Sequence, residues 1–225
     1  MRGPFPGPML LGLACISLTA CVHVGQQQLQ PWRLFSLSPL PEARQAGVID
    51  SSGPAQPAIG VGPIHLPAYL DQDQIVTRIS QNRLTLSESA RWAEPLTDNI
   101  AHVLAQNLSM LLQTDQVTVH PWPGRQRPTY QVEIEVVSFE TDTAGTAHLA
   151  ARWFLRNVAC RQMIAEKEAR LIAPAAGNST EQTVASLSKA LGDFSVVIAN
   201  VIREFVQPHT TQSAVGRPGF CSIPP

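Results

Sequence analysis

Apolar and polar residues alternate in several short stretches of the chain, which is the spacing of a β-strand with one buried face. In Tyr130–Phe139, every second residue from Tyr130 to Val136 is apolar. The stretches 74–80 and 83–87 flank a short polar turn, which indicates a hairpin. The same alternation predicts strands over residues 32–37, 58–66, 74–80, 83–87, 117–119, 130–139, 147–157 and 163–172.

Two longer stretches repeat their apolar residues every three or four positions, as an amphipathic helix does. The first follows Pro95, which suits the first turn of a helix because its missing N–H would have no partner there. The second opens at Ser179, where Gln182 three positions later completes a capping-box pattern, and it ends before Pro208. The predicted apolar stripes are Leu96, Ile100, Val103, Leu104, Leu108, Leu111 and Leu112, and then Val184, Leu187, Leu191, Phe194, Ile198, Val201, Ile202 and Phe205.

The predicted elements follow the order strands, helix, strands, helix. Runs of strands that are separated from the helices are typical of α+β domains. We therefore expect an α+β fold, with a largely antiparallel sheet and two main helices packed on it in a single domain.

The N-terminal segment carries a different pattern. Its apolar run over residues 9–18 has about ten residues, which is the length of a signal-peptide core and half of what a spanning helix needs. The run ends in Leu-Thr-Ala-Cys at residues 18–21, which resembles the lipobox of bacterial lipoproteins. This resemblance implies cleavage after residue 20 and lipidation of Cys21. The alternative is an ordinary secretory signal with a cysteine there by chance, and a cleavage register ending at Cys15 fits less well.

These patterns divide the chain into four parts. Residues 1–20 are expected to be a lipoprotein signal peptide, residues 21–31 a lipidated tether, residues 32–206 the folded domain and residues 207–225 a flexible tail. The acyl chains of Cys21 would attach the protein to the lipid bilayer on the periplasmic side of the cell envelope. Because Val22 rather than Asp follows the cysteine, the usual sorting tendency of lipoproteins favours the outer membrane.

Charge argues against one class of partner. Removing the signal peptide removes Arg2, which leaves 15 of the 16 Lys and Arg residues against 17 Asp and Glu, a net charge of −2. The basic residues are scattered, whereas binding to nucleic acid requires clustered Lys and Arg. We therefore expect no nucleic-acid partner.

Two cysteines remain for a disulfide in the mature chain. Cys15 leaves with the signal peptide and Cys21 would be lipidated, so Cys160 and Cys221 form the one candidate pair. The oxidising periplasm permits such a bond. The alternative is two unpaired thiols.

Motifs of catalysis and cofactor binding do not occur in the sequence. It has no Gly-x-Gly-x-x-Gly or Walker-type loop and no Gly-x-Ser-x-Gly elbow. The six histidines are dispersed, and Glu133 and Glu135 alternate with apolar neighbours, as on the solvent face of a strand. We therefore expect no enzyme, no catalytic residue, no cofactor and no metal site.

The turn after residue 66 is a candidate contact with a protein partner. Pro67, Tyr69 and Leu70 place apolar side chains at a rigid turn beside a polar hairpin, and exposed aromatic residues suit protein contacts. The equal alternative is that Tyr69 and Leu70 fold back onto the core.

One series of short motifs resembles the PqiC family, also called the ABC-type transport auxiliary lipoproteins. A strand ends in a Pro-x-Tyr-Leu turn, a polar hairpin follows, and a Trp-x-x-Pro-Leu motif opens the first helix. Each motif is weak, but their order and spacing are specific and cover the mature chain to about Phe205. The segments that match are 64–70, 75–76, 91–96, 104–108, 136–139 and 151–155.

The resemblance implies a membrane-anchored accessory subunit of an MCE-type lipid transport system. Its partner would be the MCE-domain protein of the transporter, and it can itself form a homo-oligomer. It would dock the transporter at the outer membrane and support envelope integrity. The alternatives are a carrier that holds a hydrophobic ligand between helix and sheet and, less favoured, a periplasmic hydrolase.

Overall fold

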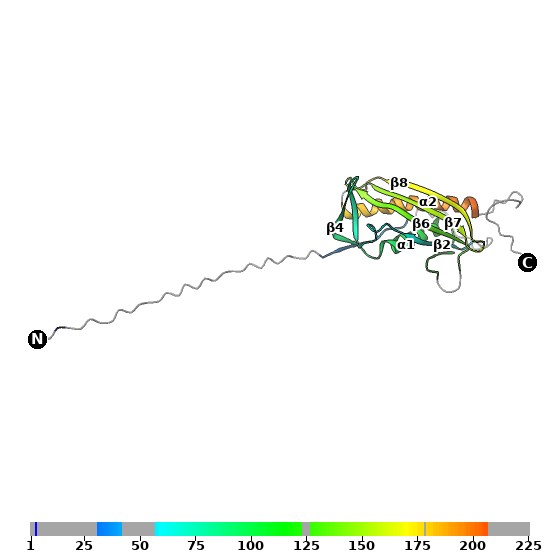
Figure 1. Cartoon of the computed structure of the whole chain (residues 1–225), viewed down its shortest axis with the longest axis horizontal. Coiled ribbons are helices and arrows are strands. Elements are labelled where there is room, and N and C mark those ends of the chain that lie inside the picture. Colours follow the sequence, from blue (N-terminus) through cyan, green and yellow to red (C-terminus); the bar gives the residue numbers. More distant parts are fainter. Residues whose placement is uncertain (1–2, 4–30, 42–56, 123–126, 178, 207–225) are drawn as a thin grey trace, which may run out of the picture. The chain divides into compact units, whose positions relative to one another are not determined.

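Figure 1 shows the computed structural model of the chain. It describes residues 3, 31–41, 57–122, 127–177 and 179–206. All helices and strands of the described residues belong to the unit Pro31–Pro225. Most of the predicted signal peptide and tether, Cys21, Cys221 and the predicted tail lie outside the described residues.

The described chain contains eight strands and two helices, and each of them lies where the sequence predicts it. Two strands reach well beyond their predicted ends, since β4 continues to Trp92 and β6 to Asp142, and β8 is one residue longer at each end. The elements are β1 Arg33–Phe35, β2 Ile59–His65, β3 Gln74–Ser80, β4 Arg83–Trp92, α1 Leu96–Leu112, β5 Val117–Val119, β6 Tyr130–Asp142, β7 Ala147–Asn157, β8 Gln162–Ala173 and α2 Thr180–Val206.

The central strand of the sheet is β6. One of its edges pairs with β7 along its whole length, and β7 pairs in turn with β8. The other edge is divided, because β2 pairs with the first half of β6 and β3 pairs only with Thr141 and Asp142. The strand β5 extends the sheet from β2, and β4 and β1 extend it from β3.

The sheet is mixed, so the expectation of a largely antiparallel sheet needs correction. Four of the seven pairings among the described strands are parallel and three are antiparallel. Strands joined by tight turns are antiparallel, as predicted. The strands β2 and β6 are joined instead by a long connection through a hairpin, α1 and β5, and such crossovers produce parallel pairs.

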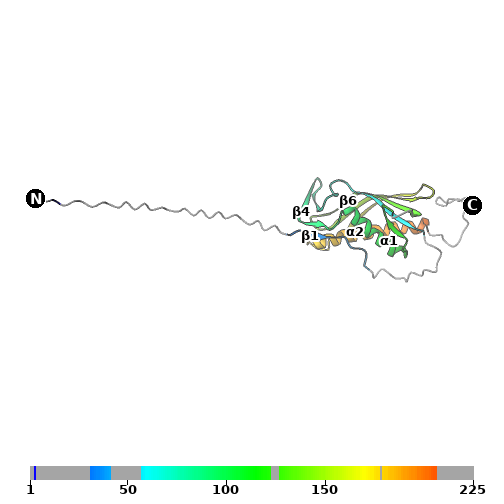
Figure 2. The same ribbon diagram turned by 90° about the horizontal axis from the view of Figure 1, so that it is seen from below.

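Both helices lie on one side of the sheet, as Figure 2 shows. The helix α1 packs on β2 and β5, α2 packs on β6, β7 and β8, and the two helices touch each other. Alternate residues of β7 from Ala147 to Leu155 are buried beneath the helices. The largest fully buried side chains are Trp153, Phe194, Ile59, Leu70, Leu104, Leu108, Ile134, Leu155, Leu187, Leu191, Ile198 and Ile202.

The helix α2 begins with the predicted capping box. The backbone N–H of Ser179 donates to Gln182 Oε1 at 3.0 Å, and that of Gln182 donates to Ser179 Oγ at 3.2 Å. By length and composition alone, Thr180–Phe205 could cross a membrane. Its apolar stripe is instead covered by the sheet, since both Leu191 and Phe194 are only 1% exposed.

The segment after β1, residues 36–41, forms a strap across the two helices. Its backbone N–H groups at Leu37 and Leu40 donate to the side-chain oxygens of Asn99 and Asn107 on α1, at 2.7 and 2.8 Å. Asn107 also donates to Ser195 Oγ of α2 at 2.9 Å. Both asparagines are buried, so they connect strap and helices inside the core.

Candidate functional site

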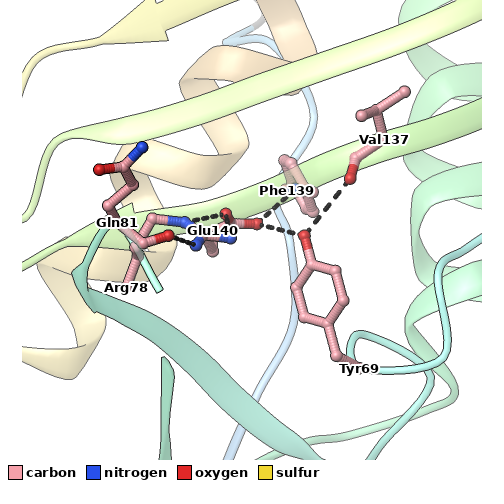
Figure 3. Close-up of polar contacts among 6 residues, drawn as sticks. All are labelled: Tyr69, Arg78, Gln81, Val137, Phe139 and Glu140. Carbon is pink, nitrogen blue, oxygen red and sulfur yellow. Dashed lines mark hydrogen bonds and ion pairs between the residues drawn. The ribbon is translucent and has the colours of Figure 1, made fainter. Parts of the chain in front are cut away.

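The predicted contact turn lies between β2 and β3, where Pro67 prevents the strand from continuing. The backbone N–H of Leu70 donates to the Pro67 carbonyl at 2.9 Å and closes the turn. The Leu70 side chain is 1% exposed and belongs to the core. For Leu70, therefore, the alternative prediction holds, in which the side chain folds back onto the core instead of contacting a partner. Tyr69 is partly buried and points along the sheet toward β6 (Figure 3).

Glu140 of β6 is a buried carboxylate that accepts a hydrogen bond from the Tyr69 hydroxyl. Tyr69 donates to Glu140 Oε2 at 2.9 Å, and Arg78 of β3 donates from Nε to Oε1 at 2.7 Å. The backbone N–H of Phe139 also donates to Oε2, at 2.9 Å. The Glu140 side chain is 2% exposed, so a buried charge is matched by donors from three segments of the chain (Figure 3).

The Glu140 cluster, which consists of Tyr69, Arg78 and Glu140, lies where the sheet divides. Along the divided edge of β6, β2 pairs as far as Glu135 and β3 begins to pair at Thr141. The turn of residues 67–70, called the Tyr69 turn below, lies beside the part of β6 between these two paired segments. The register of β6 with β7 also shifts between Val136 and Ser138, and the Tyr69 hydroxyl lies 3.4 Å from the Val137 carbonyl.

The surroundings of Tyr69 and Arg78 favour the protonated form of both side chains. Burial, together with the charge of Glu140 and the hydrogen bond to it, raises the pKa of Tyr69 from 10.0 to about 12. The hydrogen bond to Glu140 raises the pKa of the Arg78 guanidinium. At neutral pH, Tyr69 is therefore a hydrogen-bond donor and Arg78 a cation.

The hydrogen bonds of Glu140 hold the Tyr69 turn on the sheet, and they make the cluster poorly suited to proton transfer. Both carboxylate oxygens of Glu140 already accept hydrogen bonds, which occupies the lone pairs that a general base would need. The sequence patterns do not mark Arg78 or Glu140 as site residues. The one signal available is the pair of adjacent apolar residues Val136 and Val137, which interrupts the alternation where the β6–β7 register shifts.

The other predicted site residues lie away from this cluster. Cys160 lies in the turn between β7 and β8, where its backbone N–H donates to Asn157 Oδ1 at 3.2 Å. Its predicted partner Cys221 lies outside the described residues, as does Cys21. Glu133 forms an ion pair with Arg156 at 3.1 Å, and Glu135 is exposed.

Comparison with known proteins assigns the chain to a family. A family model described as "ABC-type transport auxiliary lipoprotein component" matches residues 35–199, which include both helices almost entirely and all strands after β1. The chain belongs to this family. The auxiliary lipoprotein family is defined by a role in transport, and the Tyr69 turn and the Glu140 cluster lie within the matched region.

Two solved structures share the fold. One is described only as an uncharacterized protein; it is 19% identical, with a TM-score of 0.60 over 76% of this chain and 99% of the other. The second is protein XCC0632 from Xanthomonas campestris, of the family DUF330; it is 17% identical, with a TM-score of 0.56 over 76% of this chain and 94% of the other. At these identities they establish the fold of the auxiliary lipoprotein domain alone. No curated protein matches the chain.

Proposed function

We propose that this auxiliary lipoprotein is a non-catalytic subunit of an MCE-type lipid transport system and docks the transporter at the outer membrane. The observation that carries the proposal is the family match over residues 35–199, because that family is described by its auxiliary role in transport. The MCE-domain partner and the support of envelope integrity come from the PqiC-like resemblance of the turn and helix motifs.

The proposal includes lipidation of Cys21 as the membrane attachment. Ten residues, 22–31, separate this cysteine from Trp32. A segment of that length reaches about 35 Å at full extension. The folded domain would therefore remain close to the membrane, where a docking subunit must meet its transporter.

The proposed docking surface is the Tyr69 turn together with Val137 of β6. The Val137 side chain is 64% exposed, and Ala68 beside Tyr69 is also exposed. The buried Leu70 side chain and the hydrogen bond from Tyr69 to Glu140 fix this surface to the core. A rigid apolar surface loses little conformational entropy when a partner binds. In this proposal, Pro67 and Tyr69 contact the partner and Leu70 only supports them.

The packing of the core favours docking over the carrier alternative. A carrier would need an apolar cavity between the helices and the sheet. Leu104, Trp153 and Phe194 fill that space and are each at most 1% exposed. Two surface pockets, of about 240 and about 540 Å3, are lined mostly by polar side chains.

The anchoring part of the proposal is tested by Cys21→Ala. We expect this variant to leave the membrane fraction and to lose transport, with the far-UV circular dichroism of the domain unchanged. Gln106→Ala is the matched control, because it changes an exposed side chain of α1 outside the lipobox and should remain in the membrane fraction. Full transport by Cys21→Ala in cells would show that the anchor is dispensable.

A further inference from the structure

A basic pocket opens at the end of the sheet where β6 begins and β7 ends. Its volume is about 540 Å3, within the range of small-ligand sites. Three of its six lining residues are arginines. The lining comprises Arg127, Gln131, Arg156, Asn157, Val158 and Arg161.

The positive charge of this pocket is only partly compensated. Arg156 forms an ion pair with Glu133 at 3.1 Å. The ion pairs of the described residues include neither Arg127 nor Arg161. The sequence explains this imbalance, because it contains no acidic residue between Asp115 and Glu133 and none between Asp142 and Glu166.

Backbone hydrogen bonds fix the floor of the pocket. Gln131 and Arg156 are direct partners in the β6–β7 ladder, and the N–H of Val158 donates to the Thr129 carbonyl at 2.9 Å. Arg161 has a φ of 54° in the turn that joins β7 to β8. The ladder and the hydrogen bond hold the backbone at Arg156 and Val158 in place, which reduces the ordering needed when a ligand binds.

We infer that this pocket binds an anion that carries a phosphate group, with Arg127 and Arg161 as its main ligands. A guanidinium group donates two parallel hydrogen bonds to phosphate oxygens, and several such groups are needed to compensate the charge. Arg156, already paired with Glu133, supplies the third positive charge at the wall. The inference depends on the pocket alone and does not require the proposed MCE partner.

A phosphate group can come from a lipid headgroup or from a small free phosphate, and the test separates the two. Full-length protein in a neutral detergent is titrated by calorimetry with inorganic phosphate, with glycerol 3-phosphate and with monomeric dihexanoyl phosphatidylglycerol. The same titrations use the double variant Arg127→Gln/Arg161→Gln. Arg83→Gln is the matched control, because this exposed arginine lies in the β3–β4 hairpin outside the pocket.

We expect binding that weakens at high salt, falls by about tenfold or more in the double variant and is unchanged in Arg83→Gln. Phosphatidylglycerol binding that is about tenfold tighter than the other two probes would identify a lipid headgroup, and equal affinities would identify a small phosphate. Absence of binding by any probe, or equal binding by the double variant with an unchanged melting temperature, would overturn the inference. A negative pull-down of an MCE protein would leave this result unaffected.

Discussion

At the scale of single residues, Glu140 shows how a charge is kept inside this domain. A buried carboxylate is costly unless donors surround it. Here Arg78, Tyr69 and a backbone N–H come from three different segments and converge on it. The same contacts fix the Tyr69 turn on the sheet, so stability and the proposed docking surface depend on the same groups.

Tyr69→Phe tests this dependence. The variant keeps the ring and removes the hydroxyl, so Glu140 loses one donor while the packing remains. We expect the free energy of unfolding in urea to fall by about 1–2 kcal/mol. Tyr130→Phe is the matched control, since the pKa of Tyr130 is raised by burial alone. Equal losses in the two variants would contradict the assigned role of Tyr69.

The raised pKa of Tyr69 predicts a pH dependence. Its hydroxyl ionises at about 12 in the folded state against 10.0 normally, so folding favours the neutral form. The resulting stability is fully present below about pH 10 and is lost as the pH rises toward 12. The difference in unfolding free energy between wild type and Tyr69→Phe should therefore be constant below pH 10 and shrink above it. A difference that persists to pH 12 would argue against this pKa.

At the scale of elements, the strap explains how the two helices are joined to the N-terminal strand. Asn107 accepts from the backbone of Leu40 and donates to Ser195 of α2, and thereby links three elements. The close approach of the strap also explains Gly192 of α2, because a Cβ there would lie 2.6 Å from Leu40 Cδ2. A glycine that weakens the helix locally makes room for the strap.

Asn107→Ala should destabilise the domain by about 1–3 kcal/mol, because it leaves the partly buried backbone N–H of Leu40 without its acceptor. Its exposed neighbour on α1 provides the control, and Gln106→Ala should change the unfolding free energy by less than about 0.5 kcal/mol. Urea unfolding of both variants measures the effect. A loss below about 0.5 kcal/mol for Asn107→Ala would show that the strap contributes little.

At the scale of the whole molecule, the sheet is covered by helices on one side, and the Glu140 cluster and the basic pocket lie at different points along β6. The Tyr69 turn covers the C-terminal half of this strand, and the pocket surrounds its beginning. One long strand therefore carries both proposed surfaces.

The proposed Cys160–Cys221 disulfide belongs to this scale, because it would close a loop of about 60 residues that includes α2. The chain-entropy relation gives about 4 kcal/mol of stabilisation for such a loop. We expect intact mass under non-reducing conditions to show the bond, and dithiothreitol to lower the unfolding free energy of wild type. Cys221→Ser should respond little to dithiothreitol, and an equal response from both proteins would rule out the bond.

The sequence predicts local features well and distant ones poorly. Both helices, the Ser179 capping box and the hairpins are encoded by neighbouring residues, and the structure confirms them. The parallel pairing of β2 with β6 depends on residues about 70 positions apart, which periodicity does not reveal. The same limit applies to Glu140, whose partners Tyr69 and Arg78 come from the other side of α1 in the sequence.

The family match establishes an auxiliary role in transport. The central claim of the proposed function is a direct contact with an MCE-domain protein. The most direct measurement is crosslinking in intact membranes from a photoreactive residue at Ala68, followed by purification of this chain and mass spectrometry. The matched control places the photoreactive residue at Asp115, an exposed residue of the α1–β5 connection. Its neighbour Gln116 accepts a backbone hydrogen bond from Ile59 at the beginning of β2, the end away from Ala68. We predict that an MCE-domain protein is captured from position 68 and much less from position 115. Capture of only unrelated envelope proteins from both positions would contradict the account.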